Sequence, residues 1–273
     1  MTKTKRRNIS FADKTLWLII AIAFVMIHVA LFKLYSRLFD YLWITQETQY
    51  IYDTIHSDEI QGIEQDPDLT KPDEPEANPY WDYIGMNGFT VDFDALKQIN
   101  PEVVMWVNMQ GLNINYPVVQ HSDNEYYLYH SIFRSNNEAG WVFMDYRNDP
   151  KELHKNTILY AHGRLDGTMF GSLHRALKAD WFDDVSHRTI HTISEDRHIV
   201  WQIFSVYRIP TTSDYIQTQF QDDKAYLQFL ETLKQRSQYD FALDVNVQDH
   251  ILTLSTCFDD QEKIVVHAKA LLN

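Results

Sequence analysis

The chain contains a single cysteine, Cys257, among its 273 residues. One cysteine excludes an internal disulfide and a cysteine-rich metal site. The sequence also has no His-Glu-x-x-His or similar metal-ligand spacing, and no segment of it repeats. A folded domain in this chain must therefore be held together by a packed core, for which a hydrophobic content of 45% is sufficient. We expect neither a metal ion nor another cofactor.

Basic residues are also scarce. The chain has 24 Lys and Arg against 38 Asp and Glu, a formal net charge of -14. This balance argues against a nucleic-acid partner, which normally meets a basic face. The charge is uneven, because residues 1–35 hold six basic residues and one Asp while the rest of the chain has a balance of -19. The first residues and the main body therefore face different surroundings.

One long apolar run is present, at residues 16–34. Its length matches the roughly 20 residues that a helix needs to cross a bilayer. No small-residue cleavage site follows it, which favours an uncleaved anchor over a removed signal peptide. The basic residues before it keep that end in the cytoplasm by the positive-inside rule: Lys3, Lys5, Arg6, Arg7 and Lys14. The alternative, a buried core helix, fits poorly with so basic a flank.

These features predict four regions. Residues 1–15 form a cytoplasmic tail, and residues 16–35 form a single-pass anchor in the cell membrane. Residues 36–79 combine a helical stalk with a linker, because apolar residues recur at loosely helical spacing up to residue 63 and residues 57–78 are rich in Asp, Glu and Pro. Residues 80–273 form an extracellular folded domain.

The folded domain reads as short strands separated by turn residues. Many short strands of this kind predict a mainly β fold with added helices, built on a closed or nearly closed antiparallel barrel. Two helices interrupt the strands, at residues 93–99 and 222–236, and the second has acids at its start, bases at its end and one apolar face. The expected strands cover residues 103–107, 114–119, 141–144, 157–160, 188–192, 198–207, 251–256 and 263–269.

Cys257 ends one of these strands and opens into an acidic loop. A lone cysteine can be a small buried hydrophobe. It can also be a nucleophile, which needs a base or a cation to raise its thiolate fraction. Among twelve histidines, His162 is the best candidate, because it follows a strand and lies between the small residues Ala161 and Gly163. His267 lies within an apolar strand and is expected to be structural.

Several blocks of sequence carry a family resemblance. The most specific is Thr-Leu-Ser-Thr-Cys at residues 253–257, and Leu-Tyr-Ala-His at 159–162 precedes it. Further blocks, in the same order as in the family, are Asn-Pro-Glu-Val-Val-Met-Trp-Val at 100–107, Ile-Asn-Tyr-Pro-Val-Val-Gln at 114–120, Ser-Asp-Asn-Glu-Tyr-Tyr-Leu at 122–128 and Phe-Met-Asp-Tyr-Arg-Asn at 143–148. From residue 100 onward the chain resembles a class B sortase, a membrane-anchored cysteine transpeptidase of Gram-positive bacteria.

The resemblance implies a closed eight-stranded sortase-type β-barrel behind an N-terminal transmembrane helix. It implies that Cys257 attacks a carbonyl in the sorting signal of a secreted surface protein or pilin, with His162 as its proton-transfer partner. An amine of a cell-wall precursor, or a pilin lysine, then accepts the acyl group. The resemblance also implies a peptide-binding groove, formed by Asn124, Leu128, Tyr160, Thr211, Tyr215, Ile216 and Ser255.

One position departs from the family. Where the family has an arginine at the start of the last strand, this chain has Lys263, which keeps the charge but lacks the planar fork of donors. Lys263 replaces the arginine in the oxyanion site, or Arg164 or Arg208 reaches in from another loop. The alternative is a catalytically impaired sortase-like barrel that acts as a membrane-tethered assembly factor for pili or surface proteins. A third hypothesis, a hydrolytic cysteine peptidase, differs from a transpeptidase only in which acceptor takes the acyl group from Cys257.

Overall fold

The computed structural model describes residues 11–55, 91–109, 111–112, 114–257 and 262–271. The chain divides between Thr45 and Gln46 into two compact units. Helix α1 (Phe11–Ile55) runs from the first unit into the second. Its segment Thr15–Thr54 is long enough to cross a membrane, and the most apolar 18-residue window in it has a mean hydropathy of 2.5. The predicted stalk is thus helical as far as Ile55, and the predicted acidic linker at 57–78 lies outside the described residues.

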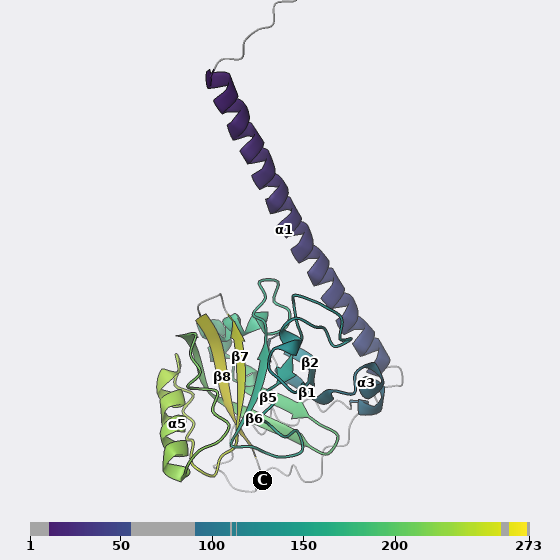
Figure 1. The fold of residues 1–273 in the computed structure, drawn as a ribbon. Helices are drawn as coiled ribbons and strands as arrows, with labels where there is room; N and C mark the ends of the chain where they lie inside the picture. Colours follow the sequence, from purple (N-terminus) through teal and green to yellow (C-terminus); the bar gives the residue numbers. More distant parts are fainter. Residues whose placement is uncertain (1–10, 56–90, 110, 113, 258–261, 272–273) are drawn as a thin grey trace, which may run out of the picture. The chain divides into compact units, whose positions relative to one another are not determined.

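The second unit is built on a closed barrel of eight strands, ordered β1-β2-β3-β4-β7-β8-β6-β5 (Figure 1). This confirms the predicted fold class. The strands are β1 (Val103–Met109), β2 (Ile114–Val119), β3 (Phe143–Met144), β4 (Asn156–Ala161), β5 (Thr189–Ile193), β6 (His198–Pro210), β7 (Ile251–Cys257) and β8 (Glu262–Ala270).

The prediction of an antiparallel barrel was wrong. β2 pairs with β3 in parallel, and β4 pairs with β7 in parallel, while the other pairs are antiparallel. Parallel neighbours need a long crossover, and nearly a hundred residues separate β4 from β7. Apolar alternation along one strand does not reveal the direction of its partner, so the sequence could not predict the parallel pairs. The predicted strand at 141–144 is also shorter, at Phe143–Met144.

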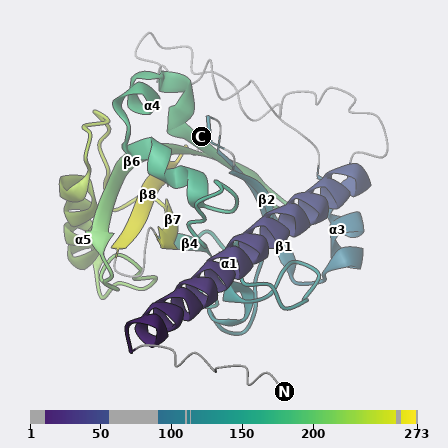
Figure 2. The ribbon, with the colours of Figure 1, turned by 90° about the horizontal axis from the view of Figure 1, so that it is seen from above.

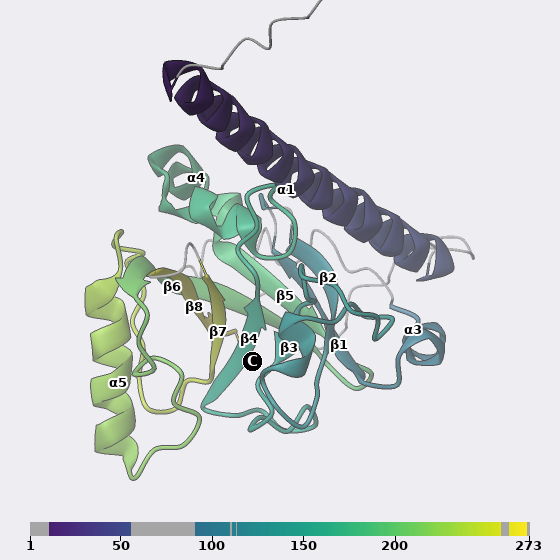
Figure 3. The same ribbon diagram turned by 45° about the horizontal axis from the view of Figure 1, so that its top comes forward.

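Helices cover the barrel at its sides. α3 (Phe93–Ile99) and α5 (Asp223–Arg236) lie on opposite sides of it (Figures 2 and 3). Shorter helical segments are α4 (Ala179–Asp183) and the 3-10 turns η1 (Tyr126–Leu128), η2 (Gly171–Leu177) and η3 (Val185–Arg188). Asp222 caps the N-terminus of α5, and its carboxylate accepts from the Ala225 N–H at 2.8 Å.

β7 is buried on both faces because the barrel interior lies on one side and α5 on the other. Leu252 lines the interior, whereas Ile251 packs in a cluster with Phe229 and Leu233 of α5. The exposed fraction of every residue from Ile251 to Thr256 is 3% or less. Burial on both faces is consistent with the absence of any charged residue from this strand.

Candidate active site

Strand register brings the predicted catalytic residues to one end of the barrel. Cys257 is the last residue of β7 and pairs directly with Lys263 of β8. On the other side, Thr256 of β7 pairs with Ala161, the last residue of β4. His162 follows Ala161 directly, so all three predicted catalytic residues lie at the same end of adjacent strands. Three neighbouring strands, and not one flexible loop, therefore position this candidate site.

His162 is held by the backbone of η1. Its Nε2 lies 2.8 Å from the carbonyl oxygen of Leu128. A carbonyl can only accept, so Nε2 carries the proton and Nδ1 of the neutral ring keeps its lone pair. Burial lowers the pKa of His162 from its ordinary value, the hydrogen bond to Leu128 raises it, and the nearby charges of Arg164 and Lys263 lower it further. The ring is thus a neutral base at neutral pH.

Two arginines near this end already have carboxylate partners. Arg164 donates to Asp166, with Nη2 and Oδ2 2.8 Å apart. Arg208 forms an ion pair with Glu262, which immediately precedes Lys263. Both guanidinium groups would have to exchange these partners before they could reach a substrate oxyanion. By strand register, Lys263 is the cation directly opposite Cys257.

The predicted groove residues Asn124 and Tyr160 converge on Asp145, a buried carboxylate directly after β3. The Tyr160 hydroxyl donates to Asp145 Oδ2 at 2.9 Å, and Asn124 Nδ2 donates to the same oxygen at 3.0 Å. Arg147 forms an ion pair with this carboxylate and also donates to the carbonyl of Ile216, 2.9 Å away. The ion pair of Asp145 and Arg147 therefore links three predicted groove residues, which are Asn124, Tyr160 and Ile216.

The remaining predicted groove residues fall into separate places. Tyr215 and Ser255 are both buried, and their hydroxyl oxygens lie 2.9 Å apart. Thr211 is exposed, directly after the end of β6. Leu128 contributes its carbonyl to His162, which differs from a side-chain role in peptide binding.

Sequence reasoning missed Asp145 and Arg147 as members of the site. Both lie in the block Phe-Met-Asp-Tyr-Arg-Asn, whose spacing places an acid and a base two residues apart at a strand end. That pattern was the available signal, but it does not reveal which distant side chains the carboxylate binds. His267 is where the sequence predicted it, fully buried and within hydrogen-bonding distance of Thr253 and Tyr207.

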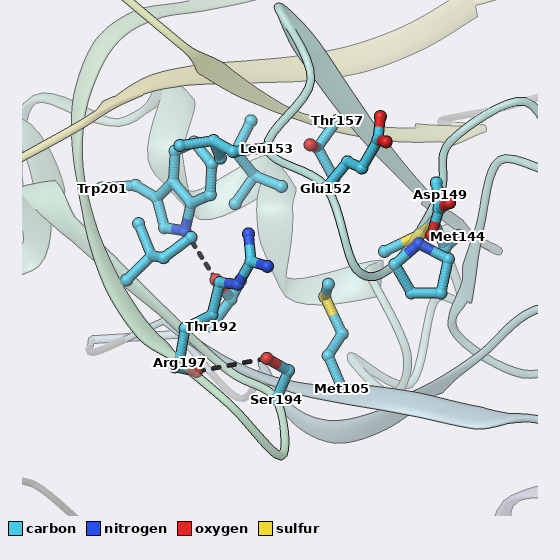
Figure 4. A pocket seen from close by; sticks show the side chains of 13 residues that line it. Met105, Met144, Asp149, Glu152, Leu153, Thr157, Thr192, Ser194, Arg197 and Trp201 are labelled. Atoms are coloured by element: carbon cyan, nitrogen blue, oxygen red, sulfur yellow. Dashed lines mark hydrogen bonds between the residues drawn. The ribbon is translucent and has the colours of Figure 1, made fainter. Parts of the chain in front are cut away.

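A separate cavity lies inside the other end of the barrel (Figure 4). Trp201, Leu252 and Thr157 line it, and none of the predicted site residues does. The Trp201 indole N–H donates to the Thr192 hydroxyl there at 2.8 Å. Within the described part of the chain, no group of three or more His, Cys, Asp or Glu residues could hold a metal ion.

Comparison with known proteins gives one consistent family. Residues 107–271 match the sortase domain model. The chain is 38% identical to sortase B of Staphylococcus aureus over 183 residues, covering 66% of this chain and 74% of that protein. It is also 38% identical to sortase B of Listeria monocytogenes over 168 residues, covering 62% of this chain and 67% of that protein.

Solved structures agree with the sequence comparison. A Staphylococcus aureus sortase B–substrate complex matches with a TM-score of 0.62 and 38% identity, over 66% of this chain and 84% of that one. Bacillus anthracis sortase B in complex with AAEK1 matches with a TM-score of 0.68 and 35% identity, over 86% of this chain and 100% of that one. Fold, strand order and sequence together show that this chain belongs to the sortase family and is a cysteine transpeptidase of the sortase B type.

Proposed function

We propose that Cys257 is the nucleophile of this transpeptidase and His162 its base and acid. The observation that carries the proposal is the register, which sets Cys257 opposite Lys263 and brings the end of β4, followed by His162, beside the end of β7. Neutral His162 takes the thiol proton through Nδ1. The thiolate then attacks a peptide carbonyl, and the positive charge of Lys263 stabilises the oxyanion of the tetrahedral intermediate.

The two halves of the reaction balance without a cofactor. When the C–N bond breaks, the imidazolium returns its proton to the leaving amine, and a thioester to Cys257 remains. An acceptor amine then attacks the thioester carbonyl and loses a proton to His162. The thiolate leaves and recovers that proton. A lowered pKa suits the breaking of the C–N bond, because the imidazolium of such a histidine gives up its proton readily to the leaving amine.

The substrate in this proposal is the sorting signal of a secreted surface protein or pilin. Its peptide lies in a groove formed by Asn124, Leu128, Tyr160, Thr211, Tyr215, Ile216 and Ser255. The acceptor is an amine of a cell-wall precursor or a pilin lysine. The proposal includes a single membrane pass with a cytoplasmic N-terminus and an extracellular catalytic domain, which the basic residues before the apolar part of α1 support.

Intact-mass spectrometry tests the nucleophile. The full chain in detergent micelles is incubated with hexapeptides that share a fixed threonine, near which the family resemblance implies the attacked carbonyl, and vary elsewhere. A mass increase equal to an acyl fragment is expected on the wild type, and its size identifies the accepted peptide. Cys257→Ala is expected to form no adduct while keeping its circular dichroism spectrum, because alanine and cysteine are similar in volume. An adduct that persists in Cys257→Ala would remove Cys257 from the reaction.

A further inference from the structure

Asp145 is a buried charge that the chemical steps do not use. Its side chain is 0% exposed, although it follows directly after β3 at the surface of the barrel. The carboxylate accepts three hydrogen bonds from Arg147, from the backbone N–H at 2.9 Å, from Nε at 2.8 Å and from Nη2 at 2.7 Å. This bidentate arrangement is the strongest form of ion pair in proteins. It fixes the Arg147 side chain in one orientation.

The same carboxylate holds two side chains from other parts of the chain. Tyr160 donates its hydroxyl from β4, and Asn124 donates its amide N–H from the segment before η1. The Asn124 carbonyl oxygen in turn accepts from the backbone N–H of Tyr146 at 3.0 Å. Both the ring of Tyr160 and the amide of Asn124 are thereby held against the segment that follows β3.

Arg147 extends this cluster to the segment that connects β6 with α5. While bound to Asp145, its Nη2 also donates to the carbonyl of Ile216. Ile216 lies in the segment between β6 and α5, which also carries Thr211 and Tyr215. The cluster of Asp145, Arg147, Asn124, Tyr160 and Ile216 therefore joins residues that are 92 positions apart in the chain.

The carboxylate of Asp145 has no remaining capacity for a ligand. Burial raises the pKa of Asp145, but the hydrogen bonds from Arg147 and Tyr160 outweigh burial and hold the pKa below its ordinary value. Five donors already share two oxygens that offer about four lone-pair sites. Asp145 therefore acts on a peptide through the side chains that it holds.

We propose that Asp145 and Arg147 are a positioning pair that sets the spacing between the two walls of the peptide groove. One wall is formed by Asn124 and Tyr160, and the other by the Ile216 segment. This inference rests on the proposed function, in which these residues bind the sorting peptide. Losing the carboxylate releases both walls at once and weakens peptide binding, while the reacting end of β7 stays in place.

Single-turnover acylation measures binding and chemistry separately. The full chain in detergent micelles is mixed with the hexapeptide chosen by adduct mass, and the acylation rate is followed over a range of peptide concentrations. Asp145→Asn is expected to raise the half-saturating concentration by at least about tenfold, as expected when charge-assisted hydrogen bonds are lost. The limiting rate at saturation is expected to stay within about twofold, because Cys257, His162 and Lys263 are untouched.

The matched control is Asp196→Asn. Asp196 also pairs with a neighbouring arginine, with Arg197 Nη2 3.2 Å from its carboxylate, but it lies at the turn between β5 and β6. This variant undergoes the same chemical change and is expected to leave both constants unaltered. A merely structural role of Asp145 would reduce the active fraction, which lowers the amplitude of acylation and leaves the half-saturating concentration unchanged.

Arg147→Lys keeps the test decisive if Asp145→Asn fails to fold. Lysine retains the charge but cannot hold Asp145 and the Ile216 carbonyl with one fork, so the half-saturating concentration is again expected to rise. Where both variants fold, the double variant is expected to be no worse than the more affected single variant, because the two side chains act as a unit. Unchanged half-saturation in the variants that fold overturns the positioning role. A wild type that forms no adduct overturns the proposed function instead.

Discussion

At the scale of single residues, the cross-strand pairing of Cys257 with a lysine is the main feature of the proposed site. Lys263 lies directly opposite the predicted nucleophile, and its charge also opposes protonation of His162. One cation would thus act on both partners of the proposed proton transfer. A lysine supplies a point charge without the fixed fork of an arginine, so its effect depends on proximity more than on geometry.

Replacing Lys263 tests its place in the oxyanion site. Lys263→Ala is expected to slow acylation by about 100-fold to 1,000-fold, the loss typical of one oxyanion-stabilising group. Lys263→Arg is expected to preserve or raise the rate. Rapid-quench measurement of adduct formation checks both. If Lys263→Ala is silent while Arg164→Ala or Arg208→Ala is damaging, then an arginine performs this role and must leave its carboxylate partner to do so.

The influence of Lys263 on His162 can be measured directly. The charges of Lys263 and Arg164 both lower the pKa of His162, so removing either raises it toward the ordinary value of about 6.5. An NMR titration of the imidazole, assigned with His162→Gln, is expected to show a midpoint below about 6.5 in the wild type. The midpoint is expected to move to higher pH in Lys263→Gln. A midpoint that does not move would place the ammonium too far away to act.

At the scale of elements, sequence patterns predict position better than partnership. α3 and β2 lie where the apolar pattern places them, at Phe93–Ile99 and Ile114–Val119, because caps, turns and periodicity are local properties. The parallel pairing of β4 with β7 is not local, and the pattern missed it. The ion pair of Asp145 and Arg147 was missed for the same reason, since its contacts span distant segments. Local setting made Cys257 and His162 the catalytic candidates, and the ordered family blocks supplied the roles that local patterns do not reveal.

His267 of β8 pairs with Thr253 of β7 and is buried. Its burial is expected to lower the stability of the folded protein at acidic pH. Burial lowers the pKa of His267 to about 3, and the positive charge of Arg236 contributes. In the unfolded chain the same side chain titrates at about 6.5, so below that pH the unfolded state binds a proton that the folded state does not. The free energy of unfolding is therefore expected to fall by about 1.4 kcal/mol per pH unit for this one group as the pH drops below about 6.5.

Urea unfolding between pH 7 and pH 5 checks this expectation. His267→Gln is expected to be less stable at pH 7, because its hydrogen bonds change, but to lose less stability on acidification. His191 provides an independent case on β5, since burial and the neighbouring His198 lower its pKa to about 4. His191→Gln is expected to reduce the pH dependence to a similar degree. An identical pH dependence in all three proteins would contradict buried neutral histidines.

At the scale of the whole molecule, the end of α1 belongs with the barrel. The Tyr52 hydroxyl donates to the carbonyl of Asn115 at 2.7 Å, and its ring lies 5.9 Å from the ring of Trp106. The Ser131 hydroxyl donates to Glu47 at 3.0 Å. The unit that contains the barrel therefore begins near Gln46. The predicted boundary at residue 80 remains a prediction about where an independently folding domain can begin.

Two truncations compare these boundaries. A fragment that begins at residue 46 keeps the contacts of Tyr52 and the buried Ile51, which is 1% exposed, whereas a fragment that begins at residue 80 loses them. The shorter fragment is expected to fold with a melting temperature lower by at least about 5 °C, from the lost apolar burial and hydrogen bonds. Calorimetry of both fragments measures the difference, and Tyr52→Phe in the longer one isolates the hydrogen bond. Equal melting temperatures would show that the end of α1 adds nothing.

The strand order of the barrel has a consequence for how the protein is made. β8 is the eighth strand in chain order, yet it lies between β6 and β7 and pairs with both. Until residues 262–270 take their place in the sheet, the folding chain presents two unpaired strand edges, which are templates for aggregation. The pairing of Cys257 with Lys263 forms at that same last step. We therefore expect closure of the barrel and completion of the proposed site to be a single event, so that a chain ending before β8 is both inactive and prone to aggregation.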